Sequence, residues 1–427
     1  MVLFQPLDAA LYVELYIIVA FVLLMKSRLR LSSPAFIFMA FYTLQMGLGP
    51  IFEIVSGRGL PSLVSPFIDV LWPLAVYVLG YCIADVFHLP KRKKSKSSPP
   101  IYIGTDTLWW AYAICILAGL VYVLKTGLNP FSDSFNDDRI ASQSGMGIFT
   151  YLNGALIVIL PLLFERVLDN QLGKKKFFGA LFVALMIFVL RGSRGLCMTP
   201  LFLMGMLIDI RKPIKWKTIV RFGLVCLVVV SVMGSMRSGN GSTFIDSIIN
   251  TTCNHVENLN RVYGAFKYSD NYQYGSTFFF NYNIILPGEG LDYTMWLKDL
   301  VGATFSGGGM TPSIVGDFYI NFGYVGVYIG MFLLGFISFR LEVAARNGSI
   351  NRVFFVYLCW ECATVVGGGI SNGMLVLTTN TLMYLGLKFI SSRNGQAMTN
   401  DGAAIQHTPY SGCESGIYKN RTTLFEL

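Results

Sequence analysis

The chain has 427 residues, of which 54% are hydrophobic and only 13% are charged, and it carries a formal net charge of +9. Soluble globular domains have about 25% charged residues, so this composition excludes an ordinary soluble domain. The positive charge is spread over several segments, which argues against a nucleic-acid partner. The apolar residues come in runs of about 15 to 25, which are long enough to cross a bilayer. We therefore expect an all-α polytopic integral membrane protein.

Eleven apolar runs, separated by polar or charged segments, are predicted to be transmembrane helices. The first run follows the acidic Asp8 rather than a basic segment, and no small-residue cleavage site comes after it. We therefore expect a true span and not a signal peptide. In chain order the predicted spans are 11–25, 34–55, 63–87, 108–124, 148–168, 177–190, 196–210, 218–236, a ninth that ends near 339, 353–366 and 374–390.

Lysine and arginine are divided unevenly between the two sides of this topology. When the connections are assigned to alternating sides, one side carries 24 of the 33 basic residues and the other carries 9. Basic loops stay in the cytoplasm, so the C-terminus is expected inside and the N-terminus outside. The predicted organisation is 1–236 as eight spans with short loops, 237–311 as one large periplasmic loop, 312–390 as three spans and 391–427 as a cytoplasmic tail.

Two arginines, Arg191 and Arg194, lie between the sixth and seventh predicted spans. A charge in the hydrocarbon costs several kcal/mol, so this position needs a reason. One reading is a plain turn made by Gly192 and Gly195, and the other is a fixed positive site for an anion. The flanking runs of about 14 and 15 residues cover only about 21–23 Å, which is short of a core of about 30 Å. The turn is therefore predicted near the outer headgroup level or in a cavity just beneath it.

The predicted outer loop is rich in tyrosine and phenylalanine, which suits either sugar stacking or the membrane interface. Within it, 254–266 reads as an amphipathic helix with His255 at the flank. Glu257 and Arg261 are four residues apart and are expected to pair with each other or with a ligand. The apolar and polar sides of this helix are Val256, Leu259, Tyr263 and Phe266 against Asn254, Glu257, Asn258 and Arg261.

The cysteines and histidines give no metal or disulfide pattern. The chain has 8 cysteines and only 3 histidines. Cys359 and Cys362 have C-x-x-C spacing but lie in a predicted span without a second ligand pair, so we expect small packing residues. No metal and no cofactor are expected.

The last motif is the run G-G-G-M-T-P-S-I-V-G-D-F-Y-I-N-F-G at 307–323. Thr311 is a suitable N-cap and Pro312 a suitable first helical residue. The helix is expected to continue without interruption to Phe339, with a length of about 28 residues or about 42 Å. Its first turns then project above the membrane. Ser313, Asp317, Asn321 and Tyr324 are predicted to share one face.

This motif, together with the G-S-R-G turn, resembles the Wzy-type O-antigen polymerases, which polymerise oligosaccharide repeat units. Asp317 stands where many members have glutamate. The aspartate keeps the negative charge but has a shorter side chain. The resemblance implies a GT-C-like glycosyltransferase fold, no metal, and a site on the periplasmic side of the bacterial inner membrane. It also implies an undecaprenyl-pyrophosphate-linked oligosaccharide as substrate and a co-polymerase partner that sets chain length. The growing chain is expected to pass from its lipid pyrophosphate to the nonreducing end of an incoming unit.

Candidate site residues follow from the motifs and from this chemistry. Arginine suits a pyrophosphate because it stays charged and offers bidentate hydrogen bonds. The base for the acceptor hydroxyl is left open among Glu257, Asp317 and His255. The candidate catalytic residues are Arg194, Arg191, Arg237, Arg261, Glu257, Asp317 and His255. The candidate substrate-binding residues are Thr311, Ser313, Tyr319, Asn321, Asn258 and Tyr263.

Two other functions are compatible with the sequence. An O-antigen ligase shares the fold and donor, uses lipid A core as acceptor and carries an essential histidine in the outer loop, a role that His255 matches. A transporter of lipid-linked sugar is expected to show internal repeats, and none is evident here. Arg191 is also left with two roles, since it could contact the ligand or tie the turn to Asp317 or Glu257.

Overall fold

The computed structural model describes residues 6–27, 30–55, 60–88, 103–127, 146–215, 217–221, 223–224, 244–267, 271–285, 291–305 and 308–400. Within these ranges all the secondary-structure elements are helices, and none is a strand. The predicted all-α class is therefore confirmed.

Seven helical stretches in the described residues are long and apolar enough to cross a membrane, which supports a multi-pass membrane protein. The predicted spans 177–190, 196–210 and 353–366 also form helices, but these have at most 18 residues. The predicted span 218–236 lies mostly outside the described residues. The count of eleven spans therefore stays a prediction. The seven stretches are Asp8–Lys26, Pro34–Val55, Pro66–Val86, Thr105–Thr126, Gly147–Leu168, Ser313–Arg346 and Ile370–Arg393.

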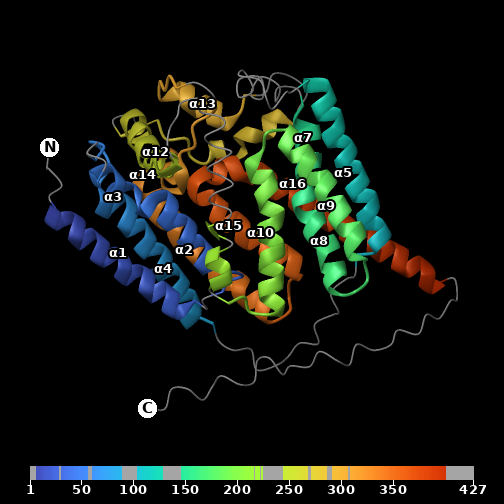
Figure 1. The fold of residues 1–427 in the computed structure, drawn as a ribbon. Coiled ribbons are helices and arrows are strands. Elements are labelled where there is room, and N and C mark those ends of the chain that lie inside the picture. Colours follow the sequence, from blue (N-terminus) through green and yellow to red (C-terminus); the bar gives the residue numbers. More distant parts are fainter. Residues whose placement is uncertain are drawn as a thin grey trace, which may run out of the picture.

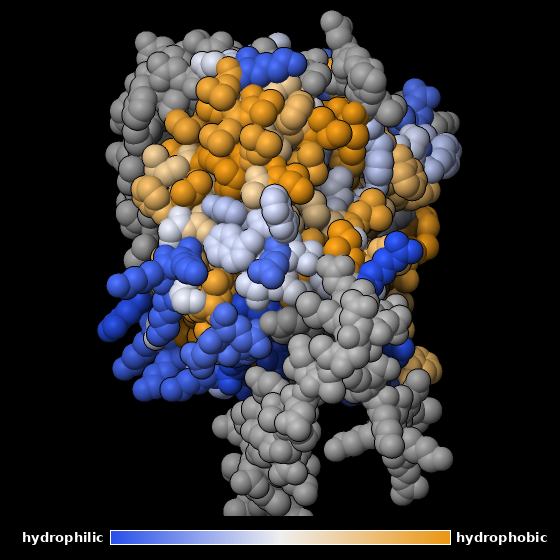
Figure 2. Space-filling view, turned by 90° about the vertical axis from the view of Figure 1, so that its right-hand side faces the viewer, coloured by the Kyte–Doolittle hydropathy of each residue, from blue (hydrophilic) through white to orange (hydrophobic). Residues whose placement is uncertain are grey.

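The surface of the bundle is apolar where lipid is expected. Ile17, Phe21 and Met25 follow one another at helical spacing on the first helix and are all exposed. In Figure 2 an apolar band covers the upper part of the face in view, and hydrophilic residues gather below it. This division is the one expected for a helical bundle in a bilayer.

A first hydrophobic core joins the N-terminal helices to later helices of the chain. Helices α4 and α14 pack most closely, because glycines let their backbones meet. A Cβ on Gly335 would lie 2.0 Å from the carbonyl oxygen of Tyr77, and one on Gly80 would lie 2.1 Å from that of Phe332. Small residues at helix interfaces let membrane helices approach each other closely in this way. The main elements of this core are α1 (Pro6–Lys26), α2 (Pro34–Tyr42), η1 (Thr43–Gly47), α3 (Gly49–Val55), η2 (Pro66–Leu71), α4 (Trp72–Val86), α12 (Phe244–Phe266), α13 (Tyr293–Leu300) and α14 (Ser313–Arg346).

A second core is formed by the middle helices and α15. Helix α15 contacts α2 and α14 on one side and α8 and α10 on the other, so it joins the two cores. Figure 1 shows α15 and α10 in the middle of the bundle, with α1 at one edge and α5 at the other. The elements of this core are α5 (Thr105–Thr126), α8 (Leu156–Leu168), α9 (Lys174–Leu190), α10 (Arg194–Arg211), α15 (Arg352–Gly368) and α16 (Ile370–Asn400), and α7 (Gly147–Gly154) packs against α5.

The segment predicted as the large outer loop forms a helical cap at one end of the bundle. The cap consists of α12, η3 (Ser276–Ile284) and α13 (Tyr293–Leu300). It lies at the top of Figure 1, beside the start of α7. The predicted amphipathic helix is confirmed, because Val256 and Leu259 on its apolar side are fully buried. Helix α12 is longer than expected, since it begins at Phe244.

The prediction of an uninterrupted helix from the glycine motif to Phe339 is wrong. Helix α14 begins at Ser313 and reaches Arg346, and it is broken at Gly323, where φ is 62° and ψ is −156°. Two backbone carbonyls just before the break accept hydrogen bonds from the cap. The amides of Gln273 and Tyr274 donate to the carbonyls of Ile320 and Asn321, both at 3.0 Å. Glycine is the residue that adopts this backbone conformation without strain.

Candidate functional site

Glu257 and Arg261 line a polar pocket of about 370 Å³ between α12 and the end of α3. The guanidinium Nε of Arg261 donates to Glu257 Oε1 at 3.2 Å, so the predicted pairing is confirmed. Both side chains remain partly exposed, at 35% and 41%. The complete lining is Glu53, Leu60, Pro61, Cys253, Asn254, Glu257 and Arg261.

Packing of α12 on the N-terminal helices positions this pocket. A Cβ on Gly49 would lie 2.3 Å from Cγ2 of Val256, so α3 lies directly against α12. This approach brings the carboxylate of Glu53, which is only 5% exposed, to the pocket. The Asn260 side chain accepts a hydrogen bond from the Leu63 amide at 3.0 Å and fixes the segment that follows α3.

His255 lies next to the pocket but does not line it. Its Nδ1 is buried and has no hydrogen-bond partner among the described residues. Burial lowers the pKa of His255 from its ordinary value of 6.5 to about 4. The imidazole is therefore neutral at physiological pH.

The carboxylate of Asp317 is fully buried and bonded to three donors. It accepts from the Tyr293 hydroxyl at 2.8 Å, from the Ser371 amide at 2.8 Å and from the Ser371 hydroxyl at 2.6 Å. These bonds join α14 to α13 of the cap and to α16. Asp317 thus lies in a structural network and lines neither of the two described pockets.

Asn321, one turn after Asp317, holds η3 in the same way. Its Oδ1 accepts from the Gly275 amide at 2.8 Å, and its Nδ2 donates to the Thr277 hydroxyl at 2.7 Å. Thr277 in turn bonds to the hydroxyl of Ser371 at 2.7 Å. Of the polar face predicted for the glycine motif, Asp317 and Asn321 bind the cap to the bundle, whereas Ser313 bonds within α14 and Tyr324 follows the break at Gly323.

The other predicted substrate-binding residues lie where α12 meets α14. Asn258 Nδ2 donates to the carbonyl of Thr311 at 3.1 Å. The hydroxyl of Ser313 accepts from the Gly316 amide at 3.3 Å. The rings of Tyr263 and Tyr319 are buried against each other, with centroids 4.4 Å apart. This placement favours structural roles for the two tyrosine rings.

Arg191 is a buried cation with neutral partners. It is 7% exposed, and its Nη1 donates to Asn153 Oδ1 at 2.5 Å, while the guanidinium stacks 4.7 Å from the ring centroid of Tyr122. Among the described residues, its Nε has no hydrogen-bond partner and no carboxylate lies within 4.0 Å of the guanidinium. Asn153 is oriented by donating to the carbonyl of Cys115 at 3.1 Å. Arg191 therefore ties the turn to α7, and the alternative of a tie to Asp317 or Glu257 is wrong.

The turn after Arg191 is made by Gly192, whose φ is 66°. Ser193 caps α10, which begins at Arg194, and Gly195 lies inside that helix rather than in the turn. The backbone of Arg194 thus stands at a helix N-terminus, where the helix dipole favours an anion. Nothing is described of the Arg194 side chain, and Arg237 lies outside the described residues.

The candidate residues fall into two groups. Glu257 and Arg261 lie in the pocket between α12 and α3, and Arg191 lies beside α7. Asp317, which is bonded to Tyr293 of α13, belongs to neither group.

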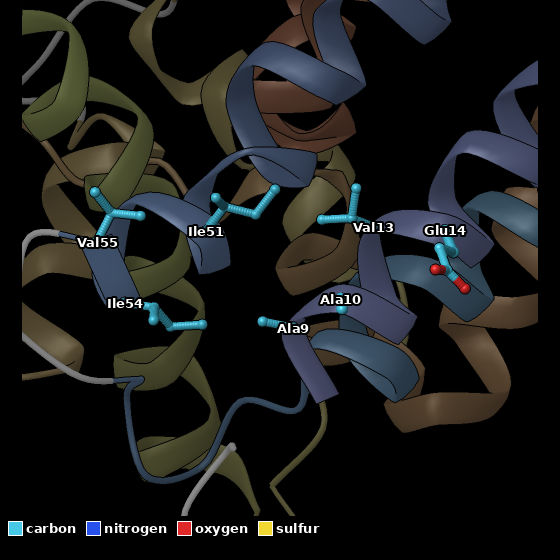
Figure 3. Close-up of a pocket in the computed structure, with 7 residues that line it drawn as sticks. All are labelled: Ala9, Ala10, Val13, Glu14, Ile51, Ile54 and Val55. Carbon is cyan, nitrogen blue, oxygen red and sulfur yellow. The ribbon is translucent and has the colours of Figure 1, made fainter. Parts of the chain in front are cut away.

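A second hollow, a groove of about 390 Å³, lies between α1 and α3 on the other side of α3 from Glu53. Figure 3 shows its apolar side chains from both helices, with Glu14 at the edge. Its lining is Ala9, Ala10, Val13, Glu14, Ile51, Ile54 and Val55. This groove is apolar, whereas the pocket beside α12 is polar.

Sequence reasoning missed Glu53, Tyr293 and Ser371. A signal existed for Glu53, because a carboxylate inside a predicted span marks a functional position. Among the described residues no group of three or more His, Cys, Asp or Glu side chains could hold a metal ion. Comparison with protein-family models, curated proteins and solved structures finds no match to this chain.

Proposed function

We propose that the protein is a membrane glycosyltransferase that polymerises lipid-linked oligosaccharide repeat units into O-antigen or a related surface polysaccharide. The substrate is an undecaprenyl-pyrophosphate-linked oligosaccharide, and the reaction takes place at the periplasmic face of the bacterial inner membrane. The proposal includes eleven spans, a GT-C-like arrangement and a co-polymerase partner. It rests on the Wzy-like motifs of the sequence and on the chemistry of the described site.

Arg191 is the observation that carries this proposal. A buried charge is costly unless it is compensated, and the described partners of this guanidinium are all neutral. Its positive potential is therefore available to an anion. Arg194, at the N-terminus of α10, adds a second charge to the same turn. A lipid-linked sugar carries a pyrophosphate, and this anion would lie at the headgroup level predicted for the turn.

The reaction needs charge stabilisation and one proton transfer. The acceptor hydroxyl oxygen attacks the anomeric carbon of the growing chain, and the bond from that carbon to the pyrophosphate oxygen breaks. The leaving pyrophosphate takes the electron pair, and the arginines stabilise its developing charge. Arg191 and Arg194 take this role, and Arg237 is proposed as a third contributor.

Glu257 is the best candidate for the base that takes the acceptor proton. It lines an open pocket and its side chain is 41% exposed, whereas Asp317 is fully buried with three donors. Arg261, bonded to Glu257 at 3.2 Å, fixes the carboxylate in place. A base must lie within hydrogen-bond reach of the proton it takes, which an enclosed carboxylate does not allow.

Deletion of the gene tests the function. Cells without the protein are expected to carry lipid A core with a single repeat unit and to lose the ladder of long chains. Core without any unit would instead indicate a ligase. A ladder that is unchanged by the deletion would contradict both functions.

A further inference from the structure

The pocket beside α12 has a charge balance that does not suit a phosphate. Its lining contains the carboxylates of Glu53 and Glu257 and the single guanidinium of Arg261, so the formal charges add to −1. Arg261 is already paired with Glu257 and lies 5.8 Å from the ring centroid of Phe305. A pyrophosphate would meet two carboxylates with no free cation among the described lining residues.

Hydroxyl groups fit this lining well. A carboxylate accepts charge-assisted hydrogen bonds from O–H donors, and Asn254 offers both a donor and an acceptor. Leu60 and Pro61 add an apolar wall for the C–H face of a ring. A volume of about 370 Å³ falls in the range of about 300–1,000 Å³ typical of small-molecule pockets.

The two faces of α3 separate this pocket from the apolar groove. Ile51, Ile54 and Val55 line the groove, whereas Glu53 lines the pocket on the opposite face. Residues 51 and 55 share a helix face by their spacing of four, and residue 53 lies across from them. A charged residue is thus directed at the polar pocket and away from the groove.

We propose that this pocket binds the sugar hydroxyls of the acceptor unit, and that Glu53 is a carbohydrate-binding residue. The lipid pyrophosphate does not enter this lining, and we assign its charge to the Arg191–Arg194 turn. This inference rests on the proposed function and divides its substrates between two places. Glu53 and Asn254 hold the acceptor sugar, and Glu257 receives its proton.

Binding of a phosphate-free oligosaccharide tests the proposal directly. The probe is a single repeat unit prepared by partial hydrolysis of the cell's own surface polysaccharide, and saturation-transfer NMR measures its binding to the purified full-length protein in detergent. Glu53→Gln and Asn254→Ala are each expected to raise the Kd at least tenfold. Asn254 is exposed, so its variant keeps the test valid if Glu53→Gln does not fold.

Glu14→Gln is the matched control, because Glu14 is a carboxylate that lines the groove and not the pocket. It is expected to bind the oligosaccharide as the wild type does. Inorganic pyrophosphate is expected not to displace the oligosaccharide. Unchanged binding in both pocket variants, displacement by pyrophosphate, or no binding to the wild type would overturn the proposal. Failure of the proposed function is seen separately, as an unchanged ladder after gene deletion.

Discussion

The hydroxyl of Tyr293 donates a 2.8 Å hydrogen bond to Asp317 and thereby joins the cap to the first turns of α14. Both residues are fully buried. The Tyr293→Phe variant removes this donor from a buried carboxylate. Bonds to charged groups contribute about 1.5–3 kcal/mol, so we expect a clear drop in the Tm of the purified protein. Tyr274→Phe is the control, because Tyr274 is 73% exposed. Equal Tm values for the two variants would contradict a role for this bond in holding the cap.

Asn153 is expected to act on the reaction through Arg191. Asn153→Asp would place a carboxylate where Oδ1 now accepts from the guanidinium, so Arg191 would stay in place while its charge is cancelled. We expect at least a tenfold loss of kcat/KM for the lipid-linked substrate, together with a lower Tm, because aspartate cannot donate to the carbonyl of Cys115. Asn153→Ala should lose stability as well, since a fully buried side chain is removed. Wild-type kinetics in Asn153→Asp would show that the charge of Arg191 is not used.

Glu257→Gln is expected to reduce kcat by about 10²-fold, which is the lower range for loss of a general base. Its effect on stability should be small, because an ion pair exposed at 35% and 41% contributes little. Turnover of the purified enzyme and its Tm are the two measurements. Asp317→Asn provides the comparison and should lose stability along with activity. Full activity in Glu257→Gln would remove Glu257 as the base.

The lowered pKa of His255 leads us to expect that the stability of the protein depends on pH. Its pKa is lowered to about 4 in the folded protein, so the unfolded chain binds more protons than the folded one between about pH 4 and 6.5. Stability contributed by the neutral imidazole is present above about pH 6.5 and is lost as the pH falls through the folded pKa. We expect the Tm to fall between pH 7 and pH 5. His255→Gln should flatten this part of the profile, and identical profiles for variant and wild type would contradict the assignment.

The local patterns of the cap helix were predictable from the sequence. Spacing of three and four residues places Val256 and Leu259 on a buried side and Glu257 and Arg261 on a partly exposed one. The pairing of Glu257 with Arg261 follows from the same spacing. Such features depend on residues within one helix, which a sequence displays directly.

Other parts of the site depend on contacts between distant segments. Glu53 reaches the pocket only because Gly49 lets α3 lie against Val256 of α12. Arg191 bonds to Asn153 because α7 packs beside the turn. The spacing of residues along the chain does not indicate this contact. The break at Gly323 likewise depends on amides that the cap donates to α14. Sequence patterns show which groups need partners but not which distant segments supply them.

The glycan ladder of cells that express Arg191→Gln or Arg194→Ala tests the central claim most directly. Lipopolysaccharide is separated by size, and immunoblotting confirms that each protein is in the membrane. Arg211→Gln is the matched control, because Arg211 stands at the other end of α10 and is paired with Asp169 at 2.6 Å. We predict that both turn variants lose the long chains and that Arg194→Lys and Arg211→Gln retain them. Normal ladders in Arg191→Gln and Arg194→Ala would contradict the assignment of this turn to the lipid pyrophosphate.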